Sequence, residues 1–319
     1  MGIMIEKFAD WVTYTLLNLS PESAAGSSVH FFIFDSIYVT IMMVLVVFLI
    51  AIIRSFITPQ KIRKWLGGRH EGVGNVIAAL LGIPTPFCSC SAVPMFIGFI
   101  ESGVPLGVTF SFLIASPMIN EIAATMLYTM FGWQIAALYI ITGFIIAVTA
   151  GMIIGRLHLE SEIEDFVYAS NLPTTSEKVL SWKDRIFFAK NESKNITLRV
   201  LPYILLGIGV GGIIHGYAPM ELLSQYAGPD NPFAVPLAVL IGIPLYMNAV
   251  GMIPILQVLT EKGVAMGTAL AFMMAVIGLS VPEMIILRKV LKIRLLVIFA
   301  GILFVAITLT GIIFNMVLG

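Results

Sequence analysis

Four uninterrupted apolar runs, each long enough to cross a lipid bilayer as a helix, constrain the fold of this chain more than any other feature of its sequence. They cover residues 31–57, 133–155, 196–216 and 293–317. Glycine and proline interrupt four further apolar stretches, at residues 72–101, 104–131, 232–261 and 264–291. Lipid tolerates such breaks only where protein or a water-filled cavity satisfies the freed backbone groups. The sequence therefore predicts an all-α polytopic membrane protein that contains broken or re-entrant helices.

The low content of charged residues agrees with this fold class and limits the kinds of partner that we expect. Charged residues make up 11% of the chain, whereas a soluble domain carries about 25%. The formal net charge is +0 and the sequence has no long basic run. We therefore expect the lipid bilayer as the surrounding medium and no nucleic acid as a partner. Because no Walker-type phosphate loop occurs, ATP hydrolysis by this chain is not expected.

The two halves of the chain repeat each other. Gly82-Ile83-Pro84 recurs as Gly242-Ile243-Pro244, an offset of 160 residues. At the same offset, the second half repeats Pro94, Glu101, Gly103, Gly107, Phe112 and Ala115. Apolar composition would match Leu and Ile by chance, but rarely turn residues in register. The pattern therefore indicates an internal repeat.

Lysine and arginine predict the orientation of the two repeats. The segment after the first span contains five of these residues between Arg54 and Arg69, whereas the equivalent segment of the second half, 217–231, contains none. Equivalent positions should therefore face opposite sides of the membrane, which makes the halves inverted-topology repeats. Secondary transporters have this architecture, with broken helices that meet at the bilayer midplane around the site.

On this interpretation the chain divides into four parts. Residues 1–30 should form an amphipathic segment at the outer interface, with the N-terminus outside, and residues 31–155 the first transmembrane repeat. A cytoplasmic linker covers residues 156–195, and the second transmembrane repeat covers residues 196–319. The acidic residues at the start of the linker are either a solvated loop or a docking site for a soluble partner. A homo-oligomer is equally compatible with the sequence.

The stretch GIPTPFCSCSAVP, residues 82–94, contains the only two cysteines of the chain. Pro84 and Pro86 should end one half-helix, so that a second half-helix can start nearby. The residues expected at its N-terminus, and expected to bind substrate, are Cys88, Ser89, Cys90 and Ser91. Free N–H groups at such a position favour a thiolate or an anion. The two thiols could bind a soft metal or metalloid, or form a transient disulfide; alternatively, they are buried cysteines that act as small apolar residues.

The corresponding stretch of the second half, GIPLYMNAVGMIP, has no cysteine. Cys88 corresponds to Asn248, and inverted symmetry should bring the two residues close together. Tyr246 and Asn248 would then offer hydrogen-bonding groups opposite the thiols; alternatively, Asn248 caps its own half-helix. The residues expected at helix breaks are Gly82, Pro84, Pro86, Pro94, Pro117, Gly242, Pro244, Pro254 and Pro282.

Two apolar stretches also contain carboxylates. Asn120 and Glu121 lie in the first half and Glu283 in the second. A carboxylate inside a bilayer is costly and is a candidate functional group by default. These residues could couple transport to protons. Alternatively, the carboxylates accept hydrogen bonds from a neighbouring helix N-terminus and are structural, which we favour for Glu283 because Arg288 and Lys289 follow it.

The motifs GIPTPFCSCSAVP, SPMINE (residues 116–121) and GIPLYMNAVGMIP resemble the predicted-permease family that includes YraQ and the ArsP organoarsenical efflux permeases. The resemblance covers the chain from about residue 31 to about residue 317. It implies a polytopic permease of the inner cell membrane. In the ArsP branch, cysteines handle trivalent organoarsenicals for export, which implies substrate contact by Cys88 and Cys90.

The leading hypothesis is a secondary transporter that works by alternating access, without a cofactor, rather than an enzyme. Its solute would be a small thiol-reactive or anionic molecule, or a metalloid, bound between the cysteine break and the Asn248 break. The alternative is a membrane thiol–disulfide oxidoreductase in which Cys88 and Cys90 cycle between dithiol and disulfide. Against this alternative stands the absence of a Cys-x-x-Cys motif and of a second cysteine pair.

Overall fold

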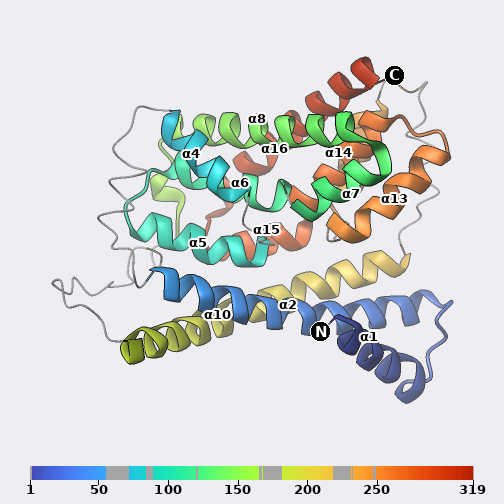
Figure 1. Ribbon diagram of the computed structural model, residues 1–319, viewed down its shortest axis with the longest axis horizontal. Coiled ribbons are helices and arrows are strands. Elements are labelled where there is room, and N and C mark those ends of the chain that lie inside the picture. Colours follow the sequence, from blue (N-terminus) through green and yellow to red (C-terminus); the bar gives the residue numbers. More distant parts are fainter. Residues whose placement is uncertain are drawn as a thin grey trace.

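The computed structural model describes residues 2–54, 72–83, 89–119, 121–164, 167, 182–217, 231, 233–245, 247 and 249–318 (Figure 1). In chain order the helices are α1 (Gly2–Asp10), the π-helix η1 (Trp11–Leu16), α2 (Ala24–Arg54), α4 (Val73–Gly82), α5 (Ser89–Glu101), α6 (Leu106–Met118), α7 (Glu121–Phe131), α8 (Trp133–Arg156), the 3-10 helix η2 (Glu160–Glu162), α10 (Trp182–Tyr217), α12 (Ala234–Gly242), α13 (Ala249–Glu261), α14 (Met266–Gly278), α15 (Val281–Leu287) and α16 (Ile293–Leu318). The described part contains no strand, only an isolated antiparallel bridge between Ile163 and Leu291. The prediction of an all-α fold is confirmed for these residues.

Several helices are suited to cross a membrane. By length and apolar composition, four described segments qualify: Ala24–Leu49 of α2, the whole of α8, α14 together with α15, and α16. A fifth span results if α6 and α7, which are bent by 47° at a short break, count as one. This bend lies within residues 104–131, where the sequence predicted a broken helix.

Two helices start earlier than the apolar runs predicted. α2 begins at Ala24, because the Ser23 hydroxyl caps the helix by accepting the Gly26 N–H at 3.0 Å. α10 begins at Trp182 and includes a polar first half, so residues 182–195 of the predicted linker are helical and continuous with the span. Lys, Arg and Glu form helices readily, but they give no signal in a search for apolar runs.

The repeat seen in the sequence is present in the structure. The pairs α5 and α13, α6 and α14, α7 and α15, and α8 and α16 each begin 160 residues apart. Buried polar contacts recur as well: the Asn75 amide donates to the Ser111 hydroxyl at 2.9 Å on one side, and the Asn315 amide donates to the Thr268 hydroxyl at 2.9 Å on the other. The internal repeat is therefore structural, while the opposite membrane orientation of its copies stays a prediction.

Equivalent helices of the two repeats pack against each other. α6 contacts α14, α8 contacts α16, and α2 contacts α10. Contacts between non-equivalent helices also occur in matching pairs. α7 packs on α13, and their equivalents α15 and α5 pack on each other. A twofold operation that swaps the repeats generates this set of contacts.

α2 and α10 form an antiparallel pair along one side of the molecule (Figure 1). The Ser193 hydroxyl of α10 donates to the Val44 carbonyl at 3.1 Å. Further along, a Cβ added at Gly209 would lie 3.6 Å from the Phe32 ring. The pair joins the rest of the molecule through contacts of α2 with α5 and of α10 with α15.

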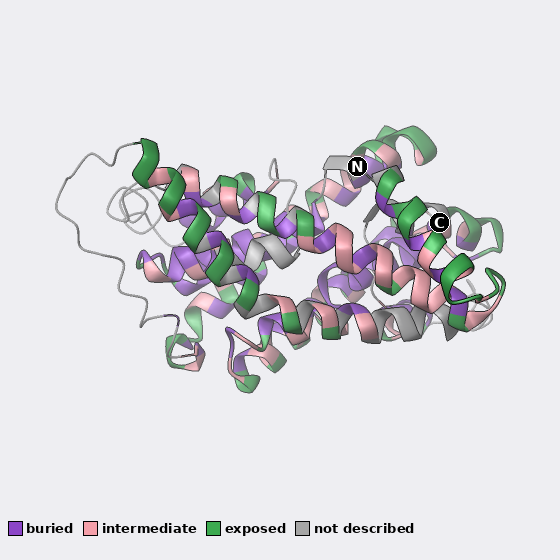
Figure 2. Ribbon diagram, turned by 90° about the horizontal axis from the view of Figure 1, so that it is seen from below, coloured by how far each residue is buried: buried purple, intermediate pink, exposed green. Residues whose placement is uncertain are grey.

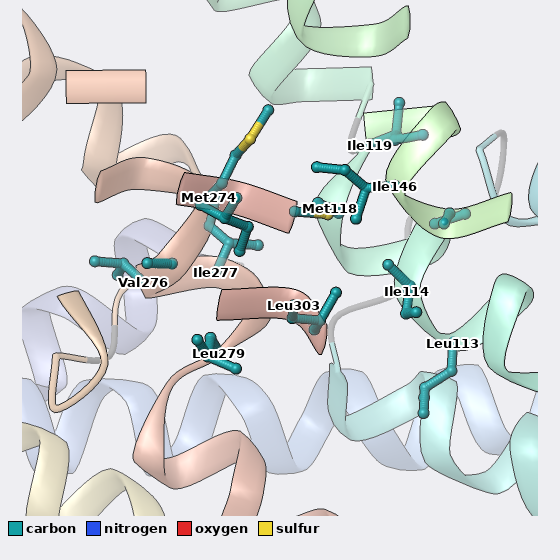
Figure 3. Close-up of a cluster of buried hydrophobic side chains, with 14 of the residues drawn as sticks. Leu113, Ile114, Met118, Ile119, Ile146, Met274, Val276, Ile277, Leu279 and Leu303 are labelled. Carbon is teal, nitrogen blue, oxygen red and sulfur yellow. The ribbon is translucent and has the colours of Figure 1, made fainter. Parts of the chain in front are cut away.

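The core lies around α6 and α14. Every residue of α6 is buried, and so is every residue of α14 after the first, whereas exposed residues line the outer sides of the long helices (Figure 2). Figure 3 shows the apolar cluster at the ends of α6 and α14, with Ile114 and Met118 from one helix and Met274 and Ile277 from the other. Helices that are apolar on all sides suit this central position.

After α8 the chain folds back onto the segment between α15 and α16. We call residues 157–164 the strap. The Glu164 N–H donates to the Val290 carbonyl at 2.9 Å, and the Lys292 N–H donates to the Glu162 carbonyl at 2.7 Å. These two bonds flank the isolated bridge and align the strap with the α15–α16 turn.

Side chains strengthen the attachment of the strap. Arg288 contacts Glu164 at 2.7 Å, and Arg294 contacts Glu162 at 3.5 Å. Ile163, between the two glutamates, is 1% exposed and belongs to the apolar core. Two of the acidic residues that the sequence suggested for a solvated loop or a soluble partner, Glu162 and Glu164, therefore form ion pairs within the chain.

Candidate functional site

The break between α4 and α5 contains the cysteine motif. α4 ends at Gly82 and α5 begins at Ser89, so Ser89, Cys90 and Ser91 form the first turn of α5. Pro84, Pro86 and Cys88 lie outside the described residues, and so do the side chains of residues 89–91. Two separate helices thus flank the position where the sequence predicted a break, and Cys90 is the second residue of the helix that follows.

The glycines before the two equivalent breaks allow close packing. A Cβ added at Gly82 would lie 3.0 Å from the Ala115 Cβ, and a Cβ added at Gly242 would lie 3.1 Å from the Ala275 Cβ. Both distances are tighter than ordinary van der Waals contact. Glycine therefore brings the ends of α4 and α12 directly onto α6 and α14, the two most buried helices.

Pro94 and Pro254 correct the sequence prediction. Both were expected at helix breaks, but they lie inside α5 and α13, which run without interruption from Ser89 and Ala249. Each proline is the sixth residue of its helix, so it removes one helical hydrogen bond without ending the helix. Pro94 still deprives one carbonyl of its donor, and this is the carbonyl of Cys90, four residues earlier.

The break between α12 and α13 contacts the start of α15. The Val281 N–H, first in α15, donates to the Ile243 carbonyl at 2.8 Å. Gly242 ends α12, and Pro244 lies in the turn that follows, whereas Tyr246 and Asn248 lie outside the described residues. One break of the second repeat is thereby bonded directly to the other.

The breaks between α6 and α7 and between α14 and α15 come together. α6 ends at Met118, one residue after Pro117, and the Met118 carbonyl accepts a hydrogen bond from the buried Tyr139 hydroxyl at 2.6 Å. A Cβ added at Gly278, the equivalent of Met118, would lie 4.0 Å from the Met118 methyl group. Residues at the same position of each repeat therefore meet at the centre of the molecule.

The structure describes the predicted coupling residues to different extents. Glu121 is the first residue of α7, but its side chain and the whole of Asn120 lie outside the described residues. Glu283 is the third residue of α15 and is 2% exposed. Its N–H donates to the Ser280 hydroxyl at 3.4 Å, so Ser280 caps the helix.

Arg288, which follows Glu283 in the sequence, contacts a different carboxylate. The sequence suggested Arg288 as a cation for the Glu283 carboxylate, but the Arg288 guanidinium binds the Glu164 carboxylate of the strap. Pro282, expected at a break, occupies the second position of α15, where its missing N–H costs nothing. Glu283 therefore lies in the core at a helix start, next to the convergence of the breaks.

Sequence reasoning missed Asp35. This residue lies in α2 and is buried, at 6% exposure. No hydrogen bond or ion pair to its carboxyl group occurs among the residues that the structure describes. The signal was present in the sequence, because Asp35 is the only charged residue between positions 31 and 53. An acidic residue inside a span is a functional candidate by default.

An aromatic column lies beside the start of α2. Tyr14 stacks on His30 at a ring-centroid distance of 5.4 Å, and Phe34 and Tyr38 continue the stack. The Asp10 carboxylate contacts the His30 Nε2 at 3.0 Å. Burial, and the Asp10 charge to a smaller extent, raise the pKa of the Tyr14 phenol above its ordinary value.

The described residues do not include a metal site. No group of three or more His, Cys, Asp and Glu side chains among them is placed to hold a metal ion. The sequence predicted the thiols of Cys88 and Cys90 as soft-metal ligands, and both side chains lie outside the described part of the chain. Metal or metalloid binding by these thiols stays a prediction.

Comparison of the sequence with known proteins shows which proteins it resembles. A family model described as a predicted permease (ArsP_1) matches residues 25–316. The UPF0718 protein MJ0584 of Methanocaldococcus jannaschii is 24% identical over 83% of this chain and 88% of its own length. The UPF0718 protein YraQ of Escherichia coli is 22% identical over 75% of this chain and 67% of its own length.

A further relative adds information on assembly. A protein of Streptococcus mutans, described as a candidate subunit of a two-component membrane permease complex, is 24% identical over 59% of this chain and 62% of its own length. No solved structure gives a significant match. None of the three relatives is named as an oxidoreductase, so the alternative of thiol–disulfide exchange finds no support in them.

Proposed function

The chain belongs to the predicted permease family whose model matches residues 25–316, and from this we propose that it is a secondary transporter that works by alternating access. The apolar helices and the family together identify an integral membrane permease. We place it in the inner cell membrane with the N-terminus outside and residues 156–181 in the cytoplasm, in agreement with the distribution of lysine and arginine.

The convergence of helix breaks is the observation that carries this proposal. The hydrogen bond from Val281 to Ile243 joins two breaks of one repeat, and the contact of Met118 with Gly278 joins one break of each repeat. Discontinuous helices that meet at a repeat interface form the solute site of many secondary transporters. The matching contacts of α7 with α13 and of α15 with α5 support a twofold axis that relates the two repeats. We propose that this axis lies in the membrane plane, so that the repeats have opposite orientations.

We assign solute binding to the two half-helix starts. The first turn of α5 contains Cys90, whose carbonyl lacks a helical donor because of Pro94. A soft sulfur ligand beside free N–H groups suits a thiol-reactive metalloid or an anion. Cys88, Ser89 and Ser91 complete this half of the proposed site.

The other half of the proposed site lies at the start of α13. Asn248 directly precedes this helix, and together with Tyr246 it would offer hydrogen-bonding groups to the solute. The resemblance to organoarsenical permeases makes a trivalent organoarsenical the first solute to test. Export is the direction that this resemblance favours.

Proton coupling is proposed for the carboxylates near the breaks. Glu121 and Glu283 begin α7 and α15, the helices that pack on the opposite repeat. Because a carboxylate in a membrane interior is costly, gain and loss of a proton there can be linked to repacking of these helices. Asn120 would provide a hydrogen-bonding group beside Glu121.

The proposal also includes a partner subunit. The Streptococcus mutans relative is described as belonging to a two-component complex, and a homo-oligomer or a soluble partner at residues 165–181 would give this chain an equivalent assembly. The strap is less suited to such a partner, because Glu162 and Glu164 already form ion pairs within the chain.

Solute flux in liposomes tests the proposed function. Full-length protein is reconstituted, a monomethylated trivalent arsenical is added outside, and arsenic that enters the vesicles is measured by mass spectrometry. We expect uptake above that of protein-free vesicles, and a loss of about tenfold or more in Cys88→Ser and in Cys90→Ser. This size is expected because even an outer-shell partner of a bound metal contributes about 10-fold to 100-fold in affinity.

A matched variant controls for nonspecific damage. Thr260→Ser alters an exposed hydroxyl of α13 that donates to the Gln257 carbonyl, away from the breaks, and should transport like the wild type. Transport that survives both cysteine substitutions would remove the thiols from the mechanism. Arsenical uptake equal to that of empty vesicles, with inorganic phosphate entering instead, would replace the metalloid by an anionic solute.

A further inference from the structure

Asp35 occupies an unusual position for a charged residue. It lies in the fourth turn of α2, within the segment Ala24–Leu49 that qualifies as a membrane span. Residues Val39, Met43 and Val47 follow it at four-residue spacing and are all buried in the main apolar core. Because residues four apart lie on the same face of a helix, Asp35 shares the inward face of α2 rather than the face toward lipid.

Several other acidic groups of the described chain have side-chain partners. Asp10 contacts His30, Glu162 contacts Arg294, and Glu261 accepts a hydrogen bond from a neighbouring amide. Asp35 has no such partner among the described residues. A buried carboxylate without a cation is strongly destabilising, whereas a neutral carboxylic acid can be accommodated in the same surroundings. A fixed structural ion pair therefore does not account for Asp35.

Three buried hydroxyls lie on the first half of α2 and on η1, which packs against it. The Ser28 hydroxyl lies two helical turns before Asp35 on the same face, and the Ser36 hydroxyl is next to it in the chain. Thr13 is on η1, which packs against α2. The hydroxyl oxygens of all three are buried without a hydrogen-bond partner among the described residues. Buried polar atoms of this kind usually bind ordered water or an ion.

The stretch of α10 that lies opposite Asp35 has no charged residue in the sequence. α10 meets α2 near Phe32 at Gly209, and residues 200–214 of α10 contain no charged side chain. On α2 itself, His30 and Tyr38 belong to the aromatic column, and His30 already contacts Asp10. The other titratable groups on elements packed against α2 are Glu6 and Lys7 of α1, Tyr14 of η1, Cys90 and Glu101 of α5, and Tyr203, His215 and Tyr217 of α10, together with seven residues before position 200 of α10: Lys183, Asp184, Arg185, Lys190, Glu192, Lys194 and Arg199.

We infer that Asp35 is a proton-binding site that exchanges protons with the membrane surface at the start of α2, along the buried hydroxyls of Ser28 and Thr13. This site is separate from Glu121 and Glu283. It rests on the proposed transport function only in one respect: in a proton-coupled cycle, Asp35 loads or releases the coupling proton, because α2 contacts α5, the helix that begins with the cysteine motif. Proton binding itself requires no solute.

Carbodiimide labelling tests proton binding without a solute. The O–H of a carboxylic acid adds across one C=N bond of dicyclohexylcarbodiimide; the oxygen bonds to the central carbon, the proton goes to nitrogen, and acyl migration gives a stable N-acylurea. Purified full-length protein in detergent is labelled from mildly acidic to mildly alkaline pH, and the Asp35 peptide is quantified by mass spectrometry. We expect label at Asp35 that falls about tenfold per pH unit above its midpoint.

Two variants and an internal reference sharpen this test. Asp35→Asn should lose the label, and Ser28→Ala should slow labelling at Asp35 while leaving labelling at Glu283 unchanged. Label at Glu283 in each variant shows that the core is still folded. Absence of label at Asp35 at every pH, or a label that does not respond to pH, would overturn the inference.

The transport role is tested separately. With the trivalent arsenical probe, Asp35→Asn should abolish the stimulation of flux by a pH gradient but keep arsenical exchange at equal pH, and Asp35→Glu should restore part of the stimulation. Full stimulation in Asp35→Asn would exclude the coupling role. If no variant and no wild type transports the arsenical, while Asp35 labels as expected, the proposed substrate fails and the proton site stands.

Discussion

In each repeat, one glycine contact brings two helices close together: α6 and α8 in the first repeat, and α14 and α16 in the second. On one side, a Cβ added at Gly107 of α6 would lie 2.5 Å from the Gly151 carbonyl of α8. On the other, a Cβ added at Gly267 of α14 would lie 2.5 Å from the Gly311 carbonyl of α16. Membrane helices gain much of their association from such close backbone approach, because lipid is as apolar as a leucine side chain.

Substitution of Gly107 should therefore destabilise the protein. In Gly107→Ala the new methyl group would overlap backbone atoms of Gly151 and Gly155, which cannot rotate away. We expect a cost of about 1–3 kcal/mol and a Tm lower by about 2 °C or more, measured by thermal unfolding of the purified protein.

Gly301→Ala is the matched control for this prediction. Gly301 is also in a long membrane helix, α16, but a Cβ there has nothing within 4 Å. The variant should be neutral or slightly stabilised, since alanine is about 1 kcal/mol better than glycine in a helix. Equal losses in Gly107→Ala and Gly301→Ala would show that the close contact does not matter for stability.

Single residues of the candidate site were predictable to different degrees. The position of Cys90 in the first turn of a helix follows from prolines and glycines alone, since these residues act on the local backbone. The same logic overestimated Pro94, because a proline early in a helix does not interrupt it. The isolation of Asp35 depends on which helices surround it, and local sequence does not contain that information.

At the scale of elements, the strap is held mainly by burial. The Arg288–Glu164 pair is partly exposed, at 47% and 31% of the two side chains, and such pairs contribute about 0–1 kcal/mol. Ile163 is fully within the core, and truncation of such a residue to alanine costs about 2–5 kcal/mol. The apolar contact should therefore dominate.

Limited proteolysis of the chain after the strap measures this difference. Ile163→Ala should speed cleavage in residues 165–181, because the strap no longer holds the start of that segment. Arg288→Ala should change cleavage little, and Leu157→Ala, which truncates an exposed strap residue, should behave like the wild type. A larger effect of Arg288→Ala than of Ile163→Ala would mean that charge, not burial, holds the strap.

Most elements were predictable because the bilayer imposes a simple rule on length and polarity. The apolar runs gave α8 and α16 to within a few residues, and glycine and proline gave the bend between α6 and α7. The early starts of α2 and α10 and the docking of the strap were not predictable. Caps, polar helical turns and contacts between distant segments leave no trace in hydropathy.

At the scale of the whole molecule, the decisive prediction is the opposite orientation of the two repeats. Glu101 and Glu261 end α5 and α13 and are equivalent positions. In a background of Cys88→Ser and Cys90→Ser, Glu101→Cys and Glu261→Cys each provide a single thiol. A membrane-impermeant maleimide should label one of them in intact cells and the other only after the membrane is opened.

The same experiment can contradict the inverted arrangement. Labelling of both thiols from one side would mean that the repeats are parallel, and the exchanged contacts of α7 with α13 and α15 with α5 would then follow from an axis normal to the membrane. A control with Ser23→Cys, in the turn before α2, should report the outer side if the N-terminus is outside.

The strap also sets an order for biogenesis. Glu164 and its partner Arg288 are 124 positions apart, so a ribosome adding about 5–20 residues per second needs on the order of 10 s between them. During that interval the first repeat can insert while Ile163 has no apolar surface to cover it. Synthesis of the α15–α16 turn then supplies the partners of the strap, so a copy that stops before residue 288 would leave Ile163 uncovered.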